Sequence, residues 1–150
     1  NKGLGRAMAL GFAQAGADLF LASRNAEELK ASAEAIAKET GRRVEWTTVD
    51  VSDRDQVAKL ATTAINKMGH IDIVINNAGM NSPQGIDAIA DETWDTILEV
   101  NLSSCMALTR GLVPQMKARK WGRVIHISSI MGIVSKEKRN AYSATKSALI

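Results

Sequence analysis

This chain has little cysteine, proline or aromatic side chain, and it lacks long apolar runs. Its 150 residues include one cysteine, Cys105, two prolines and only 4% aromatic residues. A lone cysteine excludes a disulfide within the chain and fits the reducing cytoplasm. No apolar run approaches the ~18 residues of a membrane-spanning helix, and no signal peptide is recognisable. The sequence therefore predicts a cytoplasmic protein without a membrane span.

Charge of one sign is not concentrated anywhere in the chain. The formal net charge is +3, from 19 basic and 16 acidic residues spread along the sequence. A nucleic-acid-binding surface usually combines clustered Lys and Arg with aromatic side chains for stacking, so we expect no nucleic-acid partner. His, Cys and acidic residues are nowhere spaced as metal ligands are, so we expect no metal.

Apolar runs typical of buried strands alternate with helical patterns in this chain, in which 45% of the residues are hydrophobic. The runs are residues 19–22, 44–49, 71–75 and 123–128. The helical patterns are residues 4–15, 26–40, the segment from Ser52 to Met68, about 92–118 and the segment around Tyr142. Such alternation over short connections favours right-handed crossovers. We therefore predict an α/β fold with a doubly wound parallel sheet in three αβα layers.

The helix predicted over about 92–118 is apolar nearly all round. Its apolar residues include Trp94, Ile97, Leu98, Leu102, Met106, Leu108 and Leu112. A helix of this kind is buried on two sides, which favours a homo-oligomer; the alternative is cover by other segments of the same protein. We expect Pro114 to bend or interrupt this helix.

Tyr142, the only tyrosine, stands four residues before Lys146. On a helix this spacing places the phenol and the ammonium on the same face. A free phenol titrates near pH ~10, and a neighbouring cation stabilises the phenolate form. The pair therefore favours general acid–base catalysis, although solvated neighbours on a helix often share this spacing.

Further motifs accompany this pair in one order. They are Gly3 and Gly5 at the start of the first helix, Asn76-Asn77-Ala78-Gly79 at a strand end, Asn101 on the next helix, and Ser129 thirteen residues before Tyr142. Together the motifs resemble the short-chain dehydrogenase/reductase family, and the resemblance covers essentially the whole chain. It implies a Rossmann-like fold in which ligands bind at the carboxyl ends of the strands.

The resemblance implies four catalytic residues: Asn101, Ser129, Tyr142 and Lys146. Tyr142 would donate a proton, Ser129 would hydrogen-bond the substrate oxygen, and Lys146 would support Tyr142 and bind the nicotinamide ribose. Asn101 would kink its helix and hold a water in a proton relay to Lys146. Ser128 is the rival to Ser129, but the thirteen-residue spacing matches the family at Ser129, and neighbouring strand residues face opposite ways.

The resemblance also implies a dinucleotide cofactor. The residues expected to bind it are Lys2, Gly3, Leu4, Gly5, Ser23, Arg24, Asp50, Val51, Asn77, Ala78, Gly79, Tyr142 and Lys146. Glycines let the backbone approach a pyrophosphate at a helix N-terminus. Asp50 would bond the adenine edge; alternatively, it caps the helix that follows.

Ser23 and Arg24 indicate which cofactor is used. NAD-binding members place an acid at the end of the second strand, about 20 residues past the glycines, to hold the ribose 2′-hydroxyl. Ser23 occupies that position and Arg24 follows it. A guanidinium can bind a 2′-phosphate through two hydrogen bonds, and Lys2 adds a second positive charge. We therefore predict that NADP(H) is preferred over NAD(H).

These observations predict an oxidoreductase that transfers hydride between NADP(H) and a small-molecule carbonyl or alcohol. Within the family, 3-oxoacyl-(acyl-carrier-protein) reductases and sugar or polyol dehydrogenases of the gluconate 5-dehydrogenase type resemble the sequence about equally. The alternative is a catalytically inactive NADP(H)-binding regulatory protein of the same fold. By the resemblance, residues 1–150 are a partial NAD(P)-binding domain that lacks the first strand and the C-terminal substrate region. The implied assembly is a homo-oligomer, either a dimer or a homotetramer.

Overall fold

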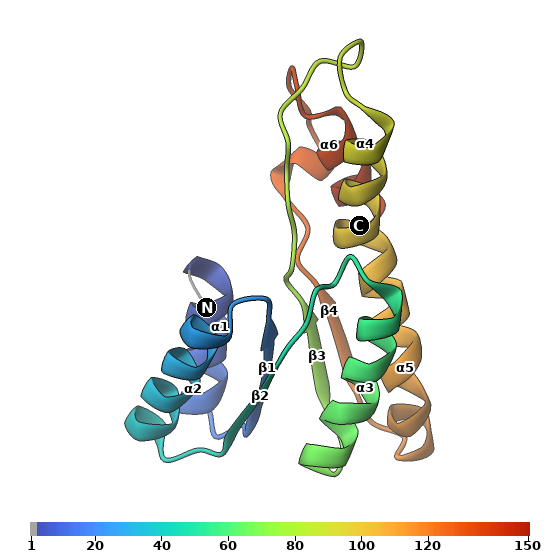
Figure 1. The fold of residues 1–150 in the computed structure, drawn as a ribbon. Helices are drawn as coiled ribbons and strands as arrows, with labels where there is room; N and C mark the ends of the chain where they lie inside the picture. The colour runs from blue at the N-terminus through green and yellow to red at the C-terminus, as the bar shows by residue number, and fades with distance from the viewer. Residues whose placement is uncertain (1–2) are drawn as a thin grey trace.

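The computed structural model describes residues 3–150, in which helices and strands alternate as predicted (Figure 1). The strands are β1 (Leu19–Ser23), β2 (Val44–Thr48), β3 (Ile73–Asn76) and β4 (Arg123–His126). The helices are α1 (Gly3–Gln14), α2 (Ala26–Thr40), α3 (Arg54–Met68), α4 (Asp91–Leu98), α5 (Ser104–Ala118) and α6 (Asn140–Ser147). The π-helical turn η1 (Glu99–Ser103) joins α4 to α5, and the short 3-10 helix η2 (Ile130–Gly132) follows β4.

The elements form three layers, as the sequence predicted. Helices α1 and α2 cover one side of β1 and β2, whereas α3 and α5 pack against each other on the other side (Figure 1). Helix α3 also contacts β2, and α5 contacts β3, so the strands lie between the two helical layers. Helices α4 and α6 pack together beyond the carboxyl end of β4.

All strand pairing among the described residues is parallel, and it divides the strands into two pairs. β1 pairs with β2 from Leu19 opposite Val44, and β3 pairs with β4 from Ile73 opposite Arg123. No backbone ladder joins β1 to β3 within residues 3–150. Each of these two strands therefore has one edge without a strand partner in this part of the chain.

Each strand pair has its own apolar core. The first contains Ala13, Leu19 and Ile36, and it lies between α1, β1 and α2. The second contains Ala61, Val74, Leu112 and Met116, and it lies between α3, β3 and α5. These two cores hold the helices against the strands, and the strand ends that they fix carry the polar residues of the site.

The helix predicted over 92–118 departs from α-helical geometry, but not at Pro114. The departure is η1, a π-helical turn that contains Asn101. Pro114 lies inside α5, which continues to Ala118. Pro114 and Arg110 are both exposed, so water can satisfy the Arg110 carbonyl that has no proline N–H to bond. The prediction of an interruption at Pro114 was therefore wrong.

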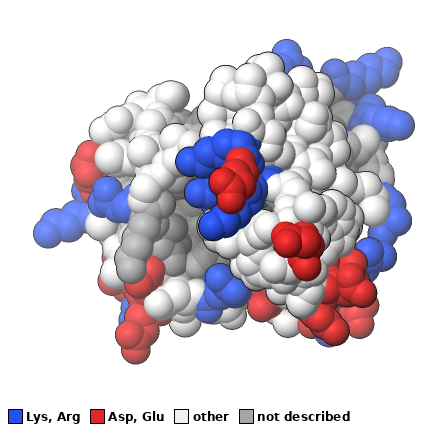
Figure 2. Space-filling model, turned by 90° about the horizontal axis from the view of Figure 1, so that it is seen from above, with Lys and Arg blue, Asp and Glu red and all other residues white. Residues whose placement is uncertain are grey.

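Charged side chains of both signs are interspersed on the face of the molecule that Figure 2 shows. On the face seen from above, Lys and Arg side chains are spread around the molecule with Asp and Glu between them (Figure 2). Within residues 3–150, no helix has the length and apolar character that a membrane crossing requires.

Candidate active site

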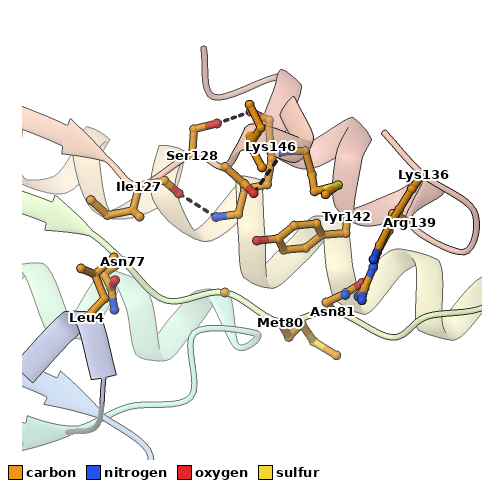
Figure 3. A pocket seen from close by; sticks show the side chains of 14 residues that line it. Leu4, Asn77, Met80, Asn81, Ile127, Ser128, Lys136, Arg139, Tyr142 and Lys146 are labelled. Carbon is orange, nitrogen blue, oxygen red and sulfur yellow. Dashed lines mark hydrogen bonds between the residues drawn. The ribbon is translucent and has the colours of Figure 1, made fainter. Parts of the chain in front are cut away.

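Helix α6 presents Tyr142 and Lys146 one turn apart on the wall of a cavity of about 540 Å³ (Figure 3). Lys146 is only 4% exposed. Its ammonium donates a hydrogen bond to the Ile127 carbonyl at 2.7 Å, just past the end of β4. It also lies 5.7 Å from the centroid of the Tyr142 ring. The helix spacing predicted from the sequence thus places a buried cation beside the half-buried phenol.

The two serines after β4 have different environments. Ser128 donates its hydroxyl hydrogen bond to the Lys146 carbonyl at 2.6 Å, so it is committed to holding α6. Ser129 begins the short helix η2, and its hydroxyl oxygen accepts a hydrogen bond from the Met131 amide at 3.1 Å. Both serines line the cavity, but only the Ser129 proton is without a partner among residues 3–150. The geometry thus favours Ser129 as the hydrogen-bond donor to a ligand.

Asn101 is fully buried and fastens three segments together. Its amide oxygen accepts from the Met80 backbone N–H at 2.8 Å, and its amide nitrogen donates to the Met80 carbonyl at 2.9 Å. The same nitrogen donates to the Thr145 hydroxyl at 3.0 Å. The Thr145 hydroxyl in turn donates to the Tyr142 carbonyl at 2.8 Å. Asn101 therefore ties the segment after β3 to α6 at the turn that carries Tyr142 and Lys146.

Sequence reasoning missed three parts of this arrangement. No pattern in the sequence predicted the role of Thr145, because a threonine between Tyr142 and Lys146 can equally face solvent. The carbonyls of Ile127 and Met80 belong to the backbone, which side-chain motifs do not reveal. The cavity is also lined by Lys136 and Arg139 from the loop before α6, which no motif singled out.

The glycine turn and the end of β3 approach each other closely. Gly3 has φ +56°, a left-handed conformation that side chains disfavour. A Cβ placed on Gly5 would lie 2.8 Å from the side-chain amide nitrogen of Asn77, so a larger residue here would require the Asn77 side chain to move. A Cβ on Gly79 would lie 3.5 Å from the Lys146 ammonium. Leu4, Asn77 and Gly79 all line the smaller cavity. Lys2 lies outside the described residues.

A second cavity, of about 840 Å³, extends from this turn between the two strand pairs. Its lining brings together most of the remaining residues expected to bind a cofactor: Gly5, Ser23, Arg24, Asp50, Val51, Asn77, Ala78 and Gly79. Asn77 and Gly79 line both cavities, so the two adjoin at the end of β3. The end of this cavity at the glycine turn and the polar strand ends suits a dinucleotide, whereas its deeper part between β1 and β3 is lined by apolar residues such as Leu19, Val57 and Val74.

Asp50 is held by its own loop and lies near Arg24. Its carboxylate accepts from the Ser52 hydroxyl at 2.7 Å and from the Ser52 amide at 2.9 Å. These hydrogen bonds, and more weakly the charge of Arg24, hold the pKa of Asp50 below its usual value. Asp53, not Asp50, is the N-terminal cap of α3 and accepts from the amides of Asp55 and Gln56. The alternative prediction of Asp50 as the cap was therefore wrong.

Cys105 is buried in α5, and its thiol donates to the Asn101 carbonyl at 3.3 Å. Burial raises the pKa of the Cys105 thiol, which keeps it neutral and suits a packing role. Over residues 3–150, His, Cys, Asp and Glu side chains form no group of three that could hold a metal ion.

Comparison with known proteins identifies the family. A family model described as short chain dehydrogenase matches residues 1–150, the whole length of the chain. The chain belongs to the short-chain dehydrogenase family.

Named relatives of this short-chain dehydrogenase chain differ in their substrates. An uncharacterized oxidoreductase of Mycobacterium tuberculosis is 39% identical over 99% of this chain and 57% of its own length. A D-beta-hydroxybutyrate dehydrogenase of Rhizobium meliloti is 33% identical over 100% of this chain and 58% of its own length. A 3-oxoacyl-(acyl-carrier-protein) reductase of Thermotoga maritima is 30% identical over 99% of this chain and 60% of its own length. The chain thus spans less than two thirds of the length of these relatives.

Solved structures share the fold closely. L-sorbose reductase from Gluconobacter frateurii, complexed with NADPH and L-sorbose, matches with TM-score 0.94 and 36% identity over 98% of this chain and 56% of that one. A metagenomic short-chain oxidoreductase in complex with NADP matches with TM-score 0.94 and 33% identity over 99% of this chain and 67% of that one. The predicted Rossmann-like, doubly wound fold is therefore confirmed.

Proposed function

We propose that the protein containing this chain transfers hydride between NADP(H) and a carbonyl or secondary alcohol, with Tyr142 as general acid and base. The observation that carries the proposal is the buried Lys146 ammonium beside the Tyr142 phenol, on a cavity wall shared with Ser129. This cavity adjoins the one lined by the glycine turn and the ends of β1 and β3. A cofactor cavity that opens onto an acid–base pair suits a redox reaction at carbon.

The residues divide the reaction between them. A bound reduced nicotinamide would supply a hydride, with its two electrons, to the carbonyl carbon. Ser129 holds the carbonyl oxygen through its hydroxyl, and Tyr142 gives that oxygen its proton, so that C=O becomes CH–OH. The ammonium of Lys146 offsets the negative charge left on the phenolate oxygen. Positioned proton transfer of this kind contributes about 10²–10⁴-fold in rate.

The role proposed for Asn101 is chiefly to position α6. Its side-chain amide is committed to Met80 and Thr145, as described above. A proton relay through water to Lys146, which the resemblance implied, would have to share these groups. We therefore propose that Asn101 contributes to the rate mainly through the placement of Tyr142 and Lys146.

Arg24 supports a preference for NADP(H). It follows Ser23 at the end of β1, lines the larger cavity, and lies near enough to Asp50 to affect its pKa. No carboxylate occupies position 23, where one would repel a 2′-phosphate. The solved relatives with NADPH and NADP are consistent with this proposal.

The relatives leave the substrate open between a 3-oxoacyl thioester, a sugar or polyol, and a hydroxy acid such as D-beta-hydroxybutyrate. An inactive regulatory protein of the same fold is the weaker alternative, because Tyr142 and Lys146 are both present and adjacent. We further propose that a strand from elsewhere in the full-length protein fills the space between β1 and β3. The cytoplasmic location and the dimer or homotetramer, paired through α4 and α5, stay predictions.

The test is an assay of the full-length protein with NADPH and NADH against ketones, ketoses, oxo acids and 3-oxoacyl thioesters. We expect oxidation of NADPH with at least one of these classes and a lower kcat/KM with NADH. Binding of NADPH without turnover of any substrate, in either direction, would support the regulatory alternative instead.

A further inference from the structure

The loop that leads into α6 places two cations on the cavity that holds Tyr142. Lys136 and Arg139 both line this cavity. The side chain of Arg139 is half-buried, and no hydrogen bond or ion pair joins the side chains of Lys136 and Arg139 to any other residue among 3–150. Unpaired cations that face a cavity are suited to hold an anion.

Acidic groups do not neutralise this end of the cavity. No described residue that lines the cavity is Asp or Glu. Glu137 lies next to Lys136, but its carboxylate is 87% exposed and pairs with Lys138 at 3.9 Å. Arg139 is the N-terminal cap residue of α6, and the first turn of this helix contains no acid. The amide groups of the helix N-terminus therefore add to the positive potential of the two side chains.

The cations lie at the end of the cavity opposite the glycine turn. Figure 3 shows Leu4 and Asn77 at one end, Lys136 and Arg139 at the other, and Tyr142 between them. Asn81 also lines the cavity, and its side-chain amide is a further hydrogen-bond donor there. Since the proposed cofactor cavity adjoins the end with Asn77, the two cations face the space left for the substrate.

We infer that the substrate is an oxo acid, or the corresponding hydroxy acid, whose carboxylate binds between Arg139 and Lys136 while its carbonyl faces Tyr142 and Ser129. This inference rests on the proposed function and narrows its substrate class. A guanidinium binds a carboxylate through two parallel hydrogen bonds, so Arg139 carries most of the selectivity and Lys136 adds charge at the entrance.

Matched pairs of substrates test the inference in the full-length protein. The pairs are 3-oxobutanoate and its methyl ester, 4-oxopentanoate and its methyl ester, and 5-oxogluconate and L-sorbose. We expect the anionic member of the best pair to have at least a tenfold higher kcat/KM. Arg139→Gln should lower this ratio about ten- to a hundredfold, chiefly through the KM of the acid. In Arg139→Lys, the ratio of kcat/KM for the acid to kcat/KM for its neutral partner should fall less than in Arg139→Gln. In Lys138→Gln, which makes the same charge change outside the cavity, this ratio should stay at the wild-type value.

Binding of butanoate to the enzyme–NADPH complex gives a readout that does not depend on turnover. We expect its Kd, measured by calorimetry, to rise at least tenfold in the Arg139→Gln variant. The inference would be overturned if Arg139→Gln left the acid-to-neutral ratio of kcat/KM unchanged while the neutral substrates were turned over. It would also be overturned if wild type and Arg139→Gln bound butanoate with the same Kd. Butanoate binding without any turnover would contradict the proposed function and leave the anion site standing.

Discussion

At the scale of single residues, we expect Arg24 to carry the proposed preference for NADP(H). A charge-assisted contact with a 2′-phosphate contributes about 1.5–3 kcal/mol, which corresponds to roughly ten- to a hundredfold in affinity. Arg24→Ala should therefore raise the Kd of NADPH by this factor and leave that of NADH nearly unchanged. Ser23→Asp should shift the balance further towards NADH, whereas Lys30→Ala, a charge loss on α2 outside the cavity, should have no effect. A wild-type protein that binds NADH more tightly in competition would refute the argument.

The two serines after β4 should differ in their effects on activity and stability. Ser129→Ala removes the proposed hydrogen-bond donor to the substrate oxygen and should lower kcat by about 10²–10³-fold. Ser128→Ala removes its bond to the Lys146 carbonyl and should cost about 1 kcal/mol of unfolding free energy with a small change in kcat. Steady-state kinetics and thermal melts of both variants test these expectations. A large loss of kcat in Ser128→Ala and a small one in Ser129→Ala would assign the role of donor to the substrate oxygen to Ser128.

The four-residue spacing of Tyr142 and Lys146 predicted correctly that the two side chains share a helix face, because the helix period fixes which side chains can meet. The resemblance favoured Ser129 over Ser128 as the residue that faces a ligand, but both serines lie beyond the end of β4 and both line the cavity. The backbone contacts could not be predicted in this way. The Ile127 carbonyl that holds Lys146 and the Asn77 amide packed against Gly5 depend on how distant segments meet in space.

The π-helical turn η1 shows how an element fails to follow its sequence pattern. We expected Pro114 to bend or interrupt the long helix, and the resemblance implied a kink at Asn101. Pro114 lies inside α5, which continues past it. The π-helical turn lies at Asn101, whose three hydrogen bonds to Met80 and Thr145 fix the turn. A poor helix former in mid-helix was the visible sign; its partners were not visible, since they come from other elements.

Asn101→Ala tests this element directly. The change leaves the Met80 N–H and carbonyl and one side of the Thr145 hydroxyl without partners in a buried site. Each buried polar group left without a partner costs about 1–3 kcal/mol, and relaxation of the site recovers part of this cost. We therefore expect the free energy of unfolding to fall by about 2–4 kcal/mol. This corresponds to a drop in Tm of roughly 4–16 °C. Asn101→Asp, which keeps the acceptor for the Met80 N–H, should lose less; an unchanged melt in Asn101→Ala would show that the contacts contribute little.

The two separate strand pairs determine what residues 1–150 can do by themselves. β1 and β3 each present an edge without a strand partner in the described part of the chain, and Val124, Ile125, Ile130 and Ile133 are exposed in and after β4. Such edges and apolar groups favour aggregation. A displacement of only ~1 Å at the site can cost about 10²-fold in rate. Expressed alone, residues 1–150 should therefore show no sharp melt and no NADPH oxidation, while a cooperative melt with turnover equal to the full-length protein would contradict this.

The most direct test of acid–base catalysis by Tyr142 is the kcat of the Tyr142→Phe variant in the full-length protein. The substitution keeps the ring and removes only the oxygen that carries the proton. We predict that kcat falls by about 10²–10⁴-fold while the Kd of NADPH stays within about twofold of wild type. Near-normal turnover in this variant would contradict the account.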